Sequence, residues 1–279
     1  MAQSELENGA TAGDGCPTLA ERFFFDNNGY LVLEEFLDAE HVKALTEALA
    51  RVMPRRRTLQ EQGIPHTGMT QIKGEKSTRI FYILDEDPLL LEMLDWPPIW
   101  PYVTGLLNAR PHHHASDALI EHTSDLRGRG GGWHIDGHDE GYRNLGPHIP
   151  LLQLKIGYYL SDMTQPGQGN LCIVPGSHKA AYEPAQEDLK QRGKAVGIEE
   201  ICAPAGTAIL FHNALWHSGG PFTREDGLRC MLYYAYEHPW MIASQEHWGY
   251  SKGFYNNLSP ERRKLFHGFL FDPPEHRWG

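Results

Sequence analysis

The first third of the chain carries apolar residues at helical spacing, interrupted by one short apolar run. Thr18 is the expected cap of a first helix, which ends at Asn27-Asn28-Gly29 because glycine readily adopts a left-handed cap. Residues 30–33 predict a strand. A second helix is expected between Asp38, its cap, and Pro54, which should end it. Its apolar positions recur every three or four residues: Val42, Leu45, Leu49 and Val52.

Polar residues without clear periodicity follow from 55 to 77, which indicates a long loop. Residues 79–84 predict a strand, and two short helices are expected over 88–95 and 97–107. From about residue 117 the pattern changes to short apolar runs separated by turns. The strands expected there are 117–123, 133–136, 152–160, 171–174, 198–202, 207–212 and 228–236. Short strands after a helical first third predict a mainly β protein, a sandwich or barrel with helices packed outside it.

The chain shows no internal repeat and no linker that would divide its 279 residues into two domains. Residues 1–17 are almost devoid of apolar side chains, so we expect them to be disordered. One domain is expected over 18–279. Its parts are a helical region over 18–110, a jelly-roll core over 117–236 and a C-terminal extension over 237–279.

The formal net charge of -11, without a compensating basic run, argues against nucleic acid as a partner. Arg55-Arg56-Arg57 is the densest basic cluster and is interpreted as a solvated helix end, with a phosphate site the less favoured alternative. No apolar leader or long apolar span is present, so a cytoplasmic protein without membrane contact is expected. Cys172, Cys202 and Cys230 lie in apolar runs and are expected to be buried, reduced thiols.

Metal-binding residue types occur in the segment Gly130-Gly131-Gly132-Trp133-His134-Ile135-Asp136-Gly137. If the segment is a strand, His134 and Asp136 point to the same face and can reach one ion. His217, in a later apolar segment, is the candidate third ligand. Two histidines and one carboxylate form the facial set that binds Fe(II) in non-haem oxygenases. An HxD pair often occurs by chance, however, so on its own it leaves an ordinary strand as an equal alternative.

Other charged residues and histidines allow more than one interpretation. Arg229 opens the last apolar strand and could hold a carboxylate through both guanidinium nitrogens, although alone it could be an ordinary edge arginine. Lys155 is out of phase with its apolar neighbours and points either into the barrel or into solvent. The run His112-His113-His114 is interpreted as a loop, because adjacent residues point in different directions. His212 is interpreted as structural, and His138 and Asp139 as candidate contacts near the ligands.

Four motifs together make a chance match improbable. They are WHIDG at 133–137, YLSD at 159–162, GNLCIVPGSHK at 169–179, and WHSGG at 216–220 followed by Arg229. The combination resembles the phytanoyl-CoA dioxygenase-like family of Fe(II)- and 2-oxoglutarate-dependent oxygenases, which have a double-stranded β-helix (jelly-roll, cupin-like) core. The resemblance covers about residues 20–240, and His178 corresponds to a structural turn of the family.

By this resemblance, His134, Asp136 and His217 are the iron ligands and Arg229 pairs with the distal carboxylate of 2-oxoglutarate. The implied reaction uses Fe(II), 2-oxoglutarate and O2 to oxidise, and most simply to hydroxylate, an unactivated C–H bond of a small metabolite. Succinate and CO2 are released. Halogenation is disfavoured because halogenating relatives replace the carboxylate that Asp136 retains here. A monomer or homodimer is expected. The alternatives are a cupin-like metal enzyme that does not use 2-oxoglutarate and a catalytically silent binding protein.

Overall fold

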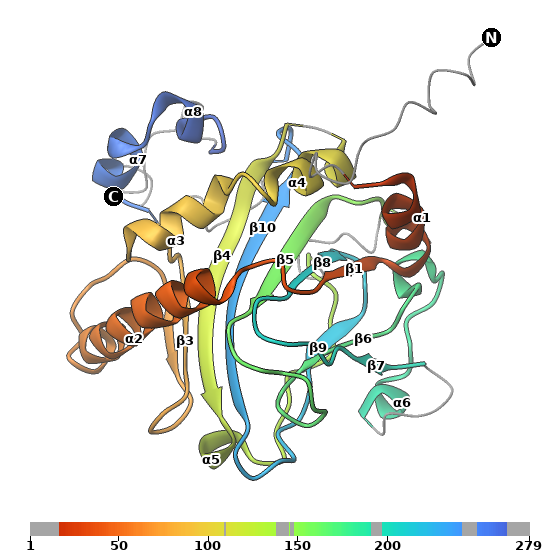
Figure 1. Cartoon of the computed structure of the whole chain (residues 1–279), viewed down its shortest axis with the longest axis horizontal. Helices are drawn as coiled ribbons and strands as arrows, with labels where there is room; N and C mark the ends of the chain where they lie inside the picture. Colours follow the sequence, from red (N-terminus) through yellow and green to blue (C-terminus); the bar gives the residue numbers. More distant parts are fainter. Residues whose placement is uncertain are drawn as a thin grey trace.

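Two antiparallel sheets form the centre of the molecule (Figure 1). The computed structural model describes residues 17–108, 110–137, 145, 148–190, 197–241 and 250–266. The larger sheet has the strand order β1 (Tyr30–Leu33), β8 (Ala208–His212), β5 (Gln153–Tyr159), β10 (Leu228–Glu237), β4 (His112–His122), β3 (Thr78–Phe81) and β2 (Thr70–Ile72). The smaller sheet has the order β7 (Glu199–Glu200), β6 (Leu171–Ile173) and β9 (His217–Gly219). This architecture confirms the predicted mainly β, jelly-roll fold class.

The central strands of the larger sheet bury both of their faces, which explains why they read as almost continuous apolar runs. On β10, Leu232 and Tyr234 belong to the apolar cluster under the helices. Met231 and Tyr233, which alternate with them, belong to a second cluster with residues of the smaller sheet. Because side chains alternate between faces, Arg229 shares the side of Met231 and Tyr233. The same rule places Lys155 of β5 opposite Leu154 and Ile156.

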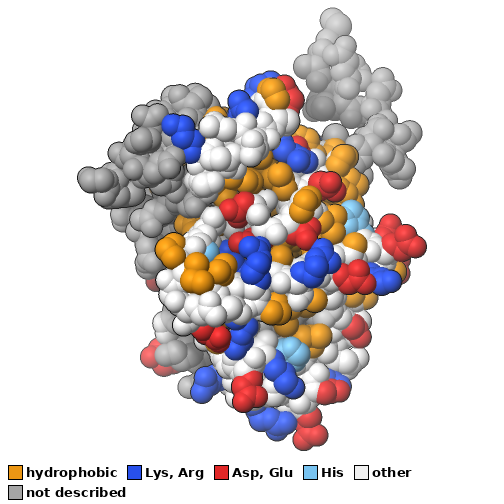
Figure 2. Space-filling model, turned by 90° about the vertical axis from the view of Figure 1, so that its left-hand side faces the viewer, with side chains coloured by type: hydrophobic (Ala, Val, Ile, Leu, Met, Phe, Trp, Pro, Cys, Tyr) orange, Lys and Arg blue, Asp and Glu red, His pale blue; other side chains and the backbone are white. Residues whose placement is uncertain are grey.

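Helices cover the outer face of the larger sheet. They are α1 (Leu19–Asn28), α2 (Ala39–Glu61), α3 (Pro88–Glu92), the 3-10 turn η1 (Met93–Asp95) and α4 (Trp100–Leu107). Two tyrosine hydroxyls of β10 tie this layer to the sheet, since Tyr234 donates to the carbonyl of Leu90 and Tyr236 to that of Leu94, each at 2.7 Å. On the α2 side of the molecule, basic and acidic side chains are interspersed with apolar ones (Figure 2).

Shorter helices lie at the ends of strands and in the C-terminal part. These are α5 (Thr123–Leu126), the 3-10 turn η3 (Ser177–Lys179), α6 (Gln186–Lys190), α7 (Lys252–Asn257) and α8 (Pro260–Arg263). No helix in the described parts of the chain combines the length and apolar character needed to cross a membrane. The cap predictions at Thr18 and Asp38 are confirmed, since both side chains accept a backbone N–H of the first turn.

The prediction that Pro54 ends the second helix is wrong, because α2 continues to Glu61. The interpretation of the arginine cluster as a solvated helix end is wrong for Arg56, whose side chain is fully buried. Its guanidinium donates to Glu86 at 2.7 Å, to Thr70 at 3.0 Å and to the carbonyl of Met69 at 3.1 Å. The free energy that these tertiary contacts contribute exceeds the loss of the one helical hydrogen bond that Pro54 cannot form, so the helix continues past it.

Further expectations from the sequence are corrected. The predicted loop over 55–77 contains the end of α2 and the strand β2. The run 112–114 is the start of β4, because it pairs with the end of β10 around Tyr236 and Glu237. Residues 133–136 form no strand but a single bridge at His134, and β9 was not predicted. Cys172 and Cys230 are buried free thiols as expected, whereas Cys202 is exposed.

Substitution of Arg56 tests the buried contacts that extend α2. We expect Arg56→Met to lower the free energy of unfolding by about 3 kcal/mol, because a buried charge pair loses one partner. The control is Arg55→Met, which removes the exposed partner of the same Glu86 and should cost less than about 1 kcal/mol. Urea unfolding measures both. Equal losses in the two variants would show that the buried contacts do not hold the helix end.

Candidate active site

A short backbone bridge joins the two segments that carry the predicted ligands. The N–H of His134 donates to the carbonyl of His217 at 3.1 Å, and the N–H of His217 donates back at 3.0 Å. Two residues further on, the N–H of Asp136 donates to the carbonyl of Asn213 at 2.8 Å. His217 is also fixed on its other side, because β9 pairs with β6. These backbone hydrogen bonds therefore position a segment that has no regular strand structure.

The bridge brings the side chains of His134, Asp136 and His217 together. One donor atom from each lies within 4.8 Å of the other two, and Asp136 Oδ1 is 3.8 Å from the Nε2 atom of each histidine. Each histidine directs Nδ1 at a backbone carbonyl, His134 at Gly132 (2.9 Å) and His217 at Leu215 (2.8 Å). Nδ1 must carry the proton in such a contact, so the lone pair of Nε2 faces the shared space. This donor set therefore fits a divalent metal ion.

The charge states of the three side chains also suit a cation. Burial, reinforced by the neighbouring His134 ring, lowers the pKa of His217 to about 3, so its imidazole is neutral at neutral pH. Burial alone would raise the pKa of Asp136. Lys155, whose Nζ lies 3.4 Å away, and the two histidines outweigh this effect and hold that pKa below its usual value. A neutral imidazole and an ionised carboxylate are the forms that bind metal.

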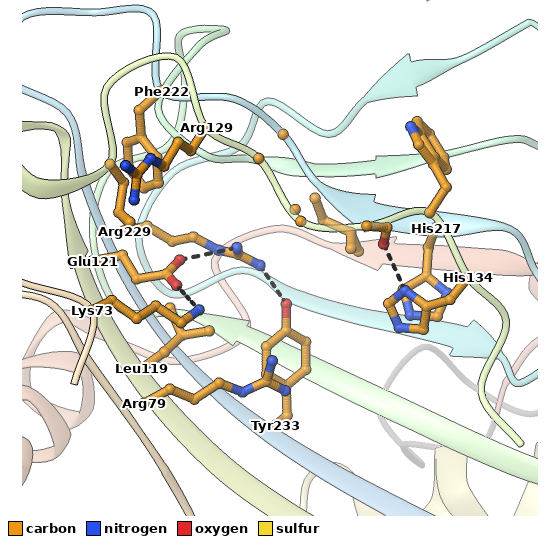
Figure 3. Close-up of a pocket in the computed structure, with 18 of the residues that line it drawn as sticks. Lys73, Arg79, Leu119, Glu121, Arg129, His134, His217, Phe222, Arg229 and Tyr233 are labelled. Carbon is orange, nitrogen blue, oxygen red and sulfur yellow. Dashed lines mark hydrogen bonds and ion pairs between the residues drawn. The ribbon is translucent and has the colours of Figure 1, made fainter. Parts of the chain in front are cut away.

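A cavity of about 560 Å³ extends from the two histidines into the space between the sheets (Figure 3). Its aromatic and aliphatic lining includes Leu119, Leu126, Trp133, Leu171, Phe211 and Phe222. Its charged lining consists of Lys73, Arg79, Glu121, Arg129, Lys155 and Arg229. The histidines lie at one end and Arg229 lies away from them along the cavity. The pocket is therefore strongly cationic in a chain whose net charge is -11.

Arg229 is only 7% exposed, and its guanidinium enters the cavity from β10. It donates to the hydroxyl of Tyr233 at 2.8 Å and to Glu121 at 3.3 Å, and its Nε contacts the sulfur of Met231 at 3.2 Å. The guanidinium lies close against Gly219, where a Cβ atom would come within 2.4 Å of Nη1. The glycine two residues after His217 therefore leaves room for this side chain.

The structure decides several open questions about other residues. Lys155 points into the cavity beside Asp136, which settles the choice that its phase in the strand left open. The run of histidines 112–114 does not join the metal-binding set: within it, His114 pairs with Glu237 at 2.7 Å. His212 accepts the N–H of Ala214 through Nδ1, a structural role as predicted. His138 and Asp139 lie outside the described residues.

Three charged residues of the cavity, Lys73, Arg79 and Glu121, were not predicted from the sequence. Glu121 is a charged residue inside an apolar strand and in phase with Leu119, a pattern that could have placed it on the inner face. Arg79 sits in β3, where its guanidinium pairs with Asp117 at 2.6 Å. Lys73 follows β2, in the region expected to be a loop, and no local pattern marks it.

Two histidines and a carboxylate on one face, with a buried arginine in the same cavity of a jelly roll, define the class of non-haem Fe(II) oxygenases. Residues 25–231, more than half of the chain, match the family described as phytanoyl-CoA dioxygenase (PhyH). The chain belongs to this family. The predicted class is thereby confirmed: a 2-oxoglutarate-dependent non-haem iron dioxygenase, with Fe(II), 2-oxoglutarate and O2, that acts on a small molecule. A cupin-like enzyme without 2-oxoglutarate and a silent binding protein are not supported.

Curated relatives agree with this assignment, and solved structures agree with the fold. The chain is 24% identical over 225 residues to an ectoine dioxygenase of Sphingopyxis alaskensis, covering 72% of this chain and 71% of that protein. It is 21% identical over 230 residues to an ectoine dioxygenase of Nocardia farcinica, covering 72% and 73%. The apo structure of EctD from S. alaskensis superposes with a TM-score of 0.65 at 23% identity, covering 83% and 80%. The structure of the α-ketoglutarate-dependent carbocyclase SnoK from nogalamycin biosynthesis superposes with a TM-score of 0.61 at 19% sequence identity. The match covers 87% of this chain and 91% of that one.

Metal-dependent stabilisation tests the three side chains directly. We expect Fe(II), added without oxygen at about one hundred times its Kd, to stabilise the fold by about 2.7 kcal/mol. His217→Ala should lose this effect because Nε2 is removed. His212→Asn, five residues away, should retain it, since an asparagine oxygen can accept the Ala214 N–H in place of Nδ1. Thermal melts with and without metal measure the shift. A full shift in His217→Ala would place the metal elsewhere.

Proposed function

We propose that this protein hydroxylates an unactivated C–H bond of a small molecule, with His134, Asp136 and His217 holding iron and Arg229 holding 2-oxoglutarate. The observation that carries the proposal is that one cavity is lined by both ligand histidines and by the buried guanidinium, with the carboxylate of Asp136 within 4.8 Å of the histidine nitrogens. Three protein ligands leave positions for cosubstrate and oxygen. A guanidinium deeper in the same cavity can bind the distal carboxylate of a dicarboxylic acid through both nitrogens.

Each part of the site has a distinct role in this proposal. Fe(II), 2-oxoglutarate and O2 together supply the oxidant for C–H cleavage, with succinate and CO2 as coproducts. The histidines keep Nε2 open through their Nδ1 contacts to backbone carbonyls. Phe211 and Phe222, both buried, exclude water from the inner wall. The retained carboxylate of Asp136 leaves no room for a halide, which favours hydroxylation over halogenation.

The cavity lining also bears on the substrate. Arg129 is exposed, and its guanidinium has no hydrogen bond or ion pair within the described chain. Trp133, half-buried beside the ligands, offers a flat apolar surface. We therefore propose a small substrate with an anionic group near an apolar body. A monomer or homodimer in the cytoplasm stays part of the proposal, and the free thiols of Cys172 and Cys230 agree with a reducing compartment.

Anaerobic spectroscopy tests the proposed function before any substrate is known. We expect Fe(II) and 2-oxoglutarate, added to metal-free protein without oxygen, to give a weak visible metal-to-ligand charge-transfer band. Admission of oxygen should then produce succinate. Arg229→Met should require much more 2-oxoglutarate to reach the same band. Absence of the band in folded protein that has bound iron would contradict the proposal.

A pair of glycine substitutions tests the position of Arg229 without touching its charge. Gly219→Ala places a Cβ where Nη1 now lies, so the guanidinium must move and we expect the dissociation constant of the cosubstrate to rise at least about tenfold. Gly132→Ala is the matched control, because a Cβ there has no neighbour within 4 Å. Titration of the anaerobic band measures both values. An unchanged dissociation constant for 2-oxoglutarate in Gly219→Ala would show that the position of Arg229 does not matter for cosubstrate binding.

A further inference from the structure

A buried carboxylate stands beside the arginine that the proposed function assigns to 2-oxoglutarate. Glu121 of β4 is 4% exposed, and its two oxygens contact different cations. Oε2 accepts from Arg229 at 3.3 Å, and Oε1 accepts from Lys73 at 2.7 Å. Figure 3 shows the three side chains in a row, with Glu121 in the middle. The shorter contact is the one to Lys73.

Glu121 creates a difficulty for any dicarboxylate that binds Arg229. A cosubstrate carboxylate on this guanidinium would lie next to a second, ionised carboxylate, and both Arg229 and Glu121 are buried. Burial alone would raise the pKa of Glu121, but Arg229 and Lys73 together keep it below its usual value, so the negative charge is present. Like charges in such surroundings repel strongly. Something must offset the charge of Glu121 if Arg229 is to attract an anion.

Two other cations that line the cavity, Arg79 and Lys155, already have partners, and Arg129 makes no hydrogen bond or ion pair to Glu121 in the described chain. Arg79 donates to Asp117 through Nε at 2.8 Å and lies 2.6 Å from it through Nη2. Lys155 lies beside Asp136. Lys73 is therefore the cation that remains to balance Glu121, and its side chain is placed by the loop after β2, where its N–H donates to the carbonyl of Ser77 at 2.9 Å.

We propose that Lys73 is a positioning residue for 2-oxoglutarate, which neutralises Glu121 and so leaves the charge of Arg229 free to bind the distal carboxylate. The inference rests on the proposed function, in which Arg229 holds the cosubstrate. An ordinary ion pair at a pocket rim contributes little to folding. The Lys73–Glu121 pair instead acts electrostatically, because it sets the net charge beside Arg229 where the dicarboxylate binds. Lys73 acts through Glu121 and need not touch the cosubstrate.

A double-mutant cycle tests the proposal, with the dissociation constant of the cosubstrate measured from the anaerobic charge-transfer band of Fe(II)-loaded protein. Lys73→Met should raise this constant about tenfold, because Glu121 then repels the anion. Glu121→Gln should bind as tightly as the wild type or more tightly. The double variant should return close to the wild-type value, because without the carboxylate no lysine is needed. Lys73→Arg, which keeps the charge, should also bind normally.

Lys76→Met is the matched control, because Lys76 is an exposed lysine of the same loop and its removal changes the net charge equally. It should leave the dissociation constant unchanged. In Lys73→Met, the Michaelis constant for the cosubstrate should rise together with the weaker binding, while kcat at saturation should change little.

The possible failures are distinguishable. Wild-type binding in Lys73→Met, or a double variant as weak as Lys73→Met alone, would overturn the role of Lys73 and leave the proposed function intact. If Arg229→Met binds 2-oxoglutarate as tightly as the wild type, or if the wild type gives no band, the proposed function itself fails and the inference falls with it.

Discussion

The site depends on one pair of backbone hydrogen bonds, those that join His134 and His217. Residues 130–137 form no regular strand, yet the two reciprocal contacts and the bond from the Gly131 N–H to the Gly219 carbonyl fix the segment against β9. The bond from Asp136 to Asn213 fixes it to the turn after β8. β9 in turn is held by β6. Two segments about eighty positions apart along the chain are thereby brought within the reach of one metal ion, and both histidines meet backbone carbonyls that set their tautomer.

The alternation of side chains along the central strands determines which charged groups face the cavity. Each central strand places apolar side chains under the helices and a few polar ones on the inner face: Lys155 from β5, Glu121 from β4 and Arg229 from β10. Charged groups at these positions are costly to bury unless they are paired. The charged side chains of this wall form ion pairs, Arg79 with Asp117 and Lys73 with Glu121. The wall can therefore be both buried and charged. Arg229 then has a defined orientation before any cosubstrate arrives.

The predictable part of the fold was that encoded locally. Caps at Thr18 and Asp38, and the apolar runs of β5, β8 and β10, were recognised because propensity and burial agree there. Pro54 was misread because tertiary contacts of Arg56 sustain the helix beyond it. The strand start at His112 was missed because its pairing with β10 is long-range. The same limit applies to the site: the motifs pointed to His134, Asp136, His217 and Arg229, whereas Lys73 meets Glu121 only through the order of β2, β3 and β4.

The central claim is that one cavity holds metal at the His134–His217 bridge and a dicarboxylate at Arg229. A crystal structure of the protein prepared without oxygen with Fe(II) and 2-oxoglutarate tests it most directly. The account predicts iron bound by Nε2 of both histidines and by the carboxylate of Asp136. It also predicts the distal carboxylate of 2-oxoglutarate on the guanidinium of Arg229, with Lys73 still on Glu121. Iron bound at another set of side chains, or 2-oxoglutarate directed away from Arg229, would contradict it.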